Sequence, residues 1–144
     1  MRARLENKIS LKELIIVFVG NAIGILFMVW LCLLLPQGKT MAENAVNIMS
    51  ARVGLPFGVI IVRATLCGIC VQLAVDMWNK GKVDKTVHPF MAMLPASAFV
   101  LLGCNHCITD MLYLAVSGSW NQALQILEAV AGNIIGAVLF SVAN

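Results

Sequence analysis

The residues best suited to chemistry lie in a short polar stretch inside an otherwise apolar segment. Within Phe90–Ser117, the octet Gly103–Asp110 reads Gly-Cys-Asn-His-Cys-Ile-Thr-Asp. Histidine is the side chain whose unperturbed pKa, near 6.5, allows proton exchange around neutral pH. Because Asn105, Thr109 and the final aspartate cluster with His106, we expect a polar site at which this histidine relays protons. The alternative is that His106 only hydrogen-bonds a neighbouring helix.

Cysteines flank this stretch in a pattern that could hold a soft metal. Four of the five cysteines form two Cys-x2-Cys pairs, and their thiolates together with an imidazole would suit Zn or Cu(I). Both pairs lie within apolar segments, where cysteine also serves as a small hydrophobic residue at helix contacts. A metal site is therefore an alternative interpretation of four residues: Cys67, Cys70, Cys104 and Cys107.

The chain that must position these residues is too apolar for a soluble domain. Of its 144 residues, 60% are hydrophobic and 12% are charged, against about 25% charged residues in soluble domains. A helix needs about 20 mainly apolar residues to cross roughly 30 Å of hydrocarbon. Four runs are long enough: residues 14–35, 53–77, 90–117 and 122–143. We expect residues 1–144 to form one all-α transmembrane bundle whose third span is interrupted at the polar octet.

Other functional classes are excluded by charge and by motif. The net charge of +3 is too small for a surface that follows nucleic-acid phosphates. The sequence contains no nucleophile–base pair, phosphate-binding loop or redox-cofactor fingerprint. We therefore expect a membrane protein that is not an enzyme and that uses no cofactor.

The basic residues predict how the chain crosses the membrane. With four spans, both termini and the loop between the second and third spans share one side, which carries seven basic residues against two on the other. Because short basic loops remain cytoplasmic, both termini are expected in the cytoplasm, and the protein in the cytoplasmic (inner) membrane. The seven are Arg2, Arg4, Lys8, Lys12, Lys80, Lys82 and Lys85, and the two are Lys39 and Arg52.

A short motif in the first span recurs in the last. Gly20, Asn21 and Gly24 have the same spacing as Gly132, Asn133 and Gly136. One explanation is two independent helix-packing faces of small residues. The other is an inverted-topology repeat of three helices, because the two copies cross the membrane in opposite directions. On that interpretation two helices are missing, and the chain is a truncated product or a degenerate relative of a six-span protein.

Three segments together resemble the formate/nitrite transporter family. The segment from Phe99 to Met111 is similar to that family's fifth-helix signature, F-x-x-x-G-F-E-H-S-x-x-N-M. Leu66 to Met77 looks like its fourth-helix pattern L-C-N-x-x-V-C-L-A-V-W-M, and Ala131 to Gly136 like its sixth-helix G-N-I-I-G. The resemblance covers the chain as helices three to six, with the first two helices and their gating loop missing.

The resemblance implies an aquaporin-like homopentamer in which each protomer has its own pore for small monovalent anions such as formate, nitrite or hydrosulfide. It implies that His106 is the central pore histidine, that Phe99 forms the apolar constriction, and that Arg52 attracts anions at the outer mouth. Transport would be channel-like or proton-coupled. A non-transporting fragment or subunit is the alternative.

The sequence also departs from the family pattern. Gly68 replaces the asparagine of helix four, Asn105 the acidic neighbour of the histidine, and Asp110 the following asparagine. Arg63 and Asp110 lie about equally far from the outer ends of their spans. Because an unpaired charge there is strongly disfavoured, we expect the two to form a buried ion pair. The alternative is that each side chain snorkels toward the membrane surface. Glu128 has no assigned role.

Overall fold

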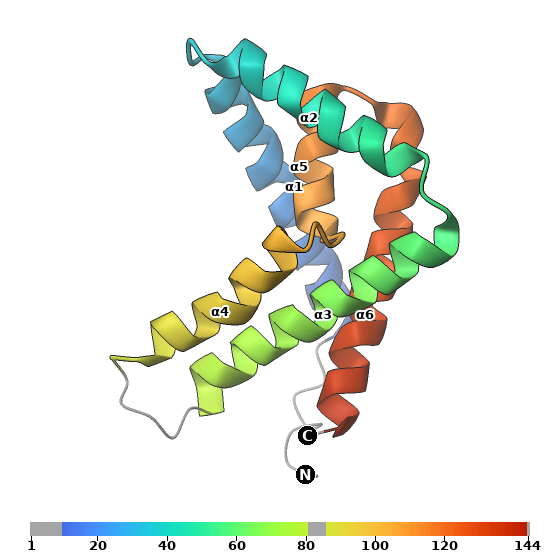
Figure 1. Cartoon of the computed structure of the whole chain (residues 1–144). Coiled ribbons are helices and arrows are strands. Elements are labelled where there is room, and N and C mark those ends of the chain that lie inside the picture. Colours follow the sequence, from blue (N-terminus) through green and yellow to red (C-terminus); the bar gives the residue numbers. More distant parts are fainter. Residues whose placement is uncertain (1–9, 81–85, 144) are drawn as a thin grey trace.

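A computed structural model describes residues 10–80 and 86–143 of the chain. Every regular element in this part of the chain is a helix, which confirms the prediction of an all-α fold (Figure 1). In chain order they are α1 (Leu11–Leu33), α2 (Gly38–Val53), α3 (Phe57–Lys80), α4 (His88–Leu101), α5 (Cys107–Ser117), a 3-10 turn (Trp120–Gln122) and α6 (Leu124–Ala143).

Three of these helices are long and apolar enough to cross a membrane. They are α1, α3 and α6, and they correspond to the first, second and fourth expected spans. The third expected span is two shorter apolar helices, α4 and α5, separated by residues 102–106. The predicted interruption is therefore present, and it falls on the polar octet.

Helix α2 is an element that the sequence did not reveal. It occupies the expected loop after the first span and takes in Val53, where the second span was expected to begin. Its buried residues Ala45 and Met49 are four apart and so share one face of the helix. Met49 packs in one cluster with Leu114 of α5 and Ile126 of α6. Helix α2 is not among the described helices that are long and apolar enough to cross a membrane.

Helices α3 and α6 cross at unusually close range through glycines. A Cβ atom added to Gly68 would collide with the carbonyl oxygen of Asn133, and one added to Gly136 would collide with that of Thr65. Gly132 likewise leaves no room for a side chain against α3. Small residues allow membrane helices to approach in this way. The contact fixes α6 against the middle of α3.

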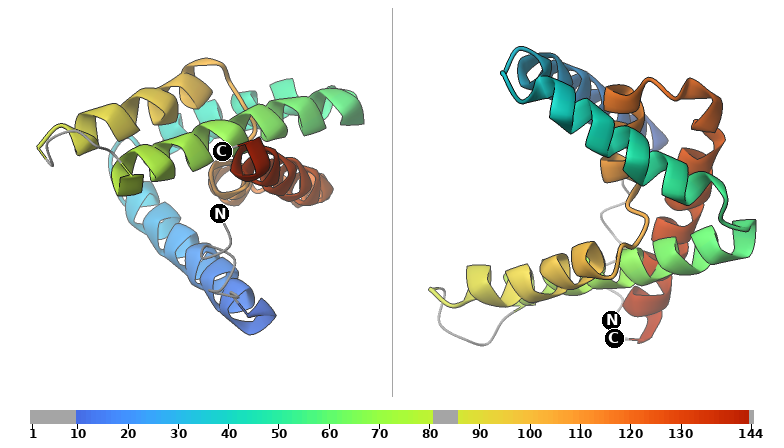
Figure 2. Two further views of the ribbon diagram at one scale, coloured as in Figure 1. Left: turned by 90° about the horizontal axis from the view of Figure 1, so that it is seen from below. Right: turned by 45° about the horizontal axis from the view of Figure 1, so that its top comes forward.

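The remaining helices are arranged around this α3–α6 pair. Helix α4 runs beside α3, and α2 lies across the upper end of α5 (Figure 1). Helix α1 contacts α5 and α2 but extends away from the α3–α4 pair (Figure 2). It begins with a capping box, in which the Ser10 hydroxyl accepts from Lys12 N–H and Glu13 accepts from Ser10 N–H.

Candidate functional site: the break between α4 and α5

The break begins where glycine ends α4. Gly103 has φ of 62° and follows the C-cap residue Leu102. The Cys104 amide donates to the Phe99 carbonyl at 3.0 Å, and the Gly103 amide donates to Val100 at 3.0 Å. This pair of bonds is a Schellman motif, which satisfies the last carbonyls of α4. The chain then runs extended through His106, the N-cap of α5 (φ −109°, ψ 120°).

The side chain of Asn133 holds the backbone on both sides of His106 against α3. Its Oδ1 accepts the Cys107 amide at 3.0 Å, and its Nδ2 donates to the Asn105 carbonyl at 2.9 Å. The same Nδ2 also donates to the Ala64 carbonyl on α3 at 2.8 Å. Irregular backbone inside a membrane is tolerated only where protein or water satisfies it. One amide therefore joins three elements and satisfies the backbone on both sides of His106.

A chain of polar side chains connects the break to α2. Asn105 Nδ2 donates to Asp110 Oδ2 at 2.9 Å, and Asp110 Oδ1 forms an ion pair with Arg52. Asp110 is only 2% exposed. The Arg52 guanidinium also lies 5.3 Å from the centre of the Tyr113 ring, a cation–π distance. The buried carboxylate is thus matched by a cation from a helix outside the candidate spans.

This pairing corrects one expectation and bears on the setting of Arg52. Asp110 pairs with Arg52 and not with Arg63, because α2 packs against α5 and its Arg52 side chain reaches Asp110 in the first turn of α5. Burial lowers the pKa of the Arg52 guanidinium below its usual value, and the positive charge of Arg63 lowers that pKa further. Arg63 is therefore a neighbour of the pair. Arg52, expected as a cation that attracts anions at the outer mouth, forms an ion pair with a buried carboxylate.

The histidine of the break stacks on an aromatic ring of α4. The ring centres of His106 and Phe99 are 5.4 Å apart, and their planes differ by 21°. Nδ1 of His106 is buried and has no hydrogen-bond partner among the described residues. The two residues expected to form the central histidine and the apolar constriction are therefore in direct contact. Thr109 lies half-buried in the first turn of α5.

The four paired cysteines lie in the interior around the break. Cys67 and Cys104 are buried, and Cys70 and Cys107 are half-buried. Within residues 10–80 and 86–143, no group of three or more His, Cys, Asp or Glu residues is arranged to hold a metal ion. The described residues therefore give the metal interpretation of these cysteines no support.

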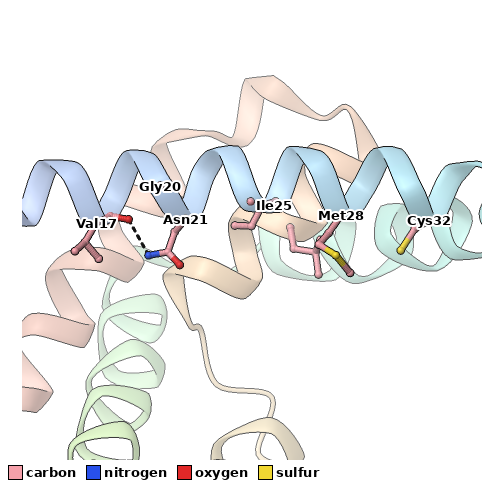
Figure 3. Close-up of a pocket in the computed structure, with 8 residues that line it drawn as sticks. Val17, Gly20, Asn21, Ile25, Met28 and Cys32 are labelled. Carbon is pink, nitrogen blue, oxygen red and sulfur yellow. Dashed lines mark hydrogen bonds between the residues drawn. The ribbon is translucent and has the colours of Figure 1, made fainter.

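The repeated motif has different surroundings in its two copies. In α6, Gly132, Asn133 and Gly136 pack on α3, as described above. In α1, a Cβ at Gly20 or Gly24 would meet no heavy atom within 4 Å. Asn21 donates only to Val17 of its own helix, at 2.8 Å, and these residues line an open, mainly apolar groove beside Leu112 of α5 (Figure 3). The helix packing expected at Gly20 and Gly24 is thus not provided by the described part of this chain.

Comparison with known families decides the class of the protein. The model of the formate/nitrite transporter family matches residues 1–143. The chain belongs to the formate/nitrite transporter family. Comparison with curated proteins and with solved structures gave no match. Members of this family are transporters and not enzymes, and at the family level their cargo is a small anion.

The polar octet was predicted from the sequence, but the two side chains that hold it, Asn133 and Arg52, were not. The role of Asn133 as a clamp was not anticipated, although its place between two glycines was a signal that a backbone approaches closely. The partner of Asp110 was misassigned, because Arg63 and Asp110 were matched by depth alone while α2, which carries Arg52, was taken as a loop.

Proposed function

We propose that this chain carries small monovalent anions of weak acids, in the class of formate, nitrite and hydrosulfide, past the break between α4 and α5. The observation that supports this most is the contact between His106 and Phe99 at a break whose backbone is held by Asn133. It places a proton-exchanging group directly beside an apolar ring. The matching family is one of anion transporters.

The chemistry follows from the cost of moving a charge past an apolar ring. A bare anion must lose its hydration there, which is expensive in a membrane interior. In the proposed step, the imidazolium of His106 gives its proton to the anion, which passes Phe99 as the uncharged acid. The neutral imidazole then takes up a proton again from water, so that no net charge crosses the constriction.

The arrangement of charge around the break is consistent with this step. Arg52 and Asp110 neutralise each other, so the pair adds no net charge beside His106. Asn105, Thr109 and Asp110 are proposed as polar residues next to the path. Because Arg52 is neutralised, we assign it to holding Asp110 and not to attracting the anion.

The proposal includes the setting of the path. Residues 1–144 form one transmembrane domain of aquaporin-like type in the cytoplasmic membrane, with both termini in the cytoplasm. Five copies assemble, each with its own path. Large apolar side chains on α4, such as Phe90 (70% exposed) and Leu101 (87% exposed), support a neighbour or lipid on that helix.

Uptake of labelled formate into liposomes that contain the full chain tests this function. We expect uptake to accelerate as the external pH falls, because protonation of His106 is required. His106→Phe should lower the rate at acidic pH at least about tenfold, or about 1.4 kcal/mol in barrier, and should flatten the pH profile. His88→Phe, at the opposite end of α4 from the break, is the matched control. An unchanged rate and pH profile in His106→Phe would rule out the relay.

A further inference from the structure

One buried polar atom in the break has a fixed identity and no partner. Asn105 is 1% exposed, and its Nδ2 donates to Asp110 Oδ2 at 2.9 Å. A carboxylate paired with arginine can only accept hydrogen bonds, so the amide nitrogen of Asn105 must be the atom that faces it. The amide orientation is therefore determined by chemistry. Its Oδ1 is consequently a buried acceptor, and it has no partner among the described residues.

No described residue donates a hydrogen bond to this oxygen. The Asn105 carbonyl is already bound by Asn133, and Arg52 is engaged by Asp110. A buried acceptor without a donor costs about 1–3 kcal/mol. The next residue, His106, also carries an unpartnered buried atom, Nδ1. The charged or titratable side chains near Cys104, which precedes Asn105, are Arg52, Arg63, Cys67 and Cys70.

We propose that Asn105 Oδ1 is a binding group for the uncharged, protonated form of the permeant acid, whose O–H or S–H donates to it. This inference rests on the proposed function and deepens it by naming the species bound at the break. A formate or nitrite anion presents only lone pairs, and these repel a carbonyl oxygen. The protonated acid presents the one donor that Oδ1 lacks. Asp110 acts here as a positioning residue, because its carboxylate holds the amide in this orientation.

Infrared spectroscopy of the full chain in liposomes tests the proposal without requiring transport. The side-chain amide carbonyl of asparagine, labelled with 13C, absorbs at lower frequency when its oxygen accepts a hydrogen bond. We expect formate to shift one asparagine band in acidic buffer and to leave it unchanged at neutral pH. Formamide, an uncharged N–H donor of similar size, should shift the same band at both pH values. Methyl formate, which has no donor, should shift it at neither.

Two asparagine variants identify which residue gives the band that shifts with ligand. Asn105→Leu should lose the ligand-dependent shift, whereas Asn21→Leu, which removes an exposed asparagine on α1, should retain it. If Asn105→Leu fails to fold, Asn105→Gln keeps an amide at this position but removes the labelled asparagine carbonyl, and it should likewise lose the ligand-dependent asparagine band. A band that responds to the formate anion, or to none of the three conditions that supply a donor, overturns the proposal and leaves water as the partner of Oδ1.

This outcome is separable from that of the uptake experiment. A shift of the Asn105 band in a chain that conducts nothing would support the binding group and contradict the proposed transport. Conversely, if uptake depends on His106 but no ligand shifts the Asn105 band, the proton relay is supported and the binding role of Asn105 is overturned.

Discussion

At the scale of single residues, one ion pair decides how the break is held. The carboxylate of Asp110 is buried and accepts from Asn105 on one oxygen and Arg52 on the other. Removing one member of a buried pair leaves an uncompensated charge, which costs far more than removing both. The pair therefore links the orientation of the Asn105 amide to the position of α2.

A double-mutant cycle tests this link. We expect Arg52→Met and Asp110→Asn each to lower the free energy of unfolding by about 3–5 kcal/mol. The double variant should lose much less than the sum, because neither charge is left alone. Asp110→Asn still offers an acceptor to Asn105. The measurement is unfolding in mixed detergent micelles, followed by circular dichroism.

The control for this cycle is the pair Arg63 and Asp110, which was expected because the two residues lie about equally far from the outer ends of their spans. Arg63→Met combined with Asp110→Asn should give additive losses, since Arg63 does not pair with Asp110. Strong coupling between Arg63 and Asp110, with none between Arg52 and Asp110, would show that the ion pair described above is not the one that forms in the membrane.

The residues of the site were predictable to different degrees for a physical reason. A histidine, an asparagine and an aspartate inside an apolar run are conspicuous, because each is expensive there without a purpose. Their partners are not conspicuous. Arg52 lies in a polar segment where a cation is ordinary, and only the path of α2 brings it to Asp110.

At the scale of helices, the two copies of the glycine–asparagine motif show what packing adds to sequence. Both copies have the same spacing, yet Gly136 is pressed against Thr65 of α3 while Gly24 faces an open groove. The repeat was visible in the sequence. Which copy is covered depends on the neighbouring helix, and no local pattern in α1 or α6 encodes that.

Alanine at the two equivalent glycines should have opposite effects. Gly136→Ala places a methyl group against the Thr65 carbonyl, so we expect a loss of about 1–3 kcal/mol in the free energy of unfolding. Gly24→Ala meets no atom within 4 Å, and alanine is favoured over glycine in a helix by about 0.5–1 kcal/mol. The Gly24→Ala variant should therefore be as stable as the original chain or slightly more stable.

The measurement is again detergent unfolding, with both variants prepared in parallel. Equal destabilisation by both substitutions would mean that the α1 groove is filled when the protein is in a membrane. If neither substitution lowers the free energy of unfolding, α3 and α6 are not in close contact at Gly136.

At the scale of the whole molecule, most of the apolar surface is not buried within one chain. Only 6% of the α1 window that could cross the membrane is buried, against 22% for α3 and α6. Composition predicted the class of fold for this reason: lipid, and not a protein core, is the solvent for most apolar residues. Composition could not predict α2, whose buried Met49 packs with Leu114 of α5 and Ile126 of α6.

The assembly expected from the family resemblance can be measured on the intact chain. We expect native mass spectrometry of the protein released from detergent micelles to show complexes of five copies. The physical reason is that α1 and α4 present long apolar faces that further copies can cover, as Phe90, Met93 and Leu94 on α4 illustrate. A dilution series at constant detergent concentration distinguishes a closed assembly from chance co-occupancy, because only a closed assembly keeps its stoichiometry. Single chains at every protein-to-detergent ratio would contradict the pentamer, and these faces would then be covered by lipid alone.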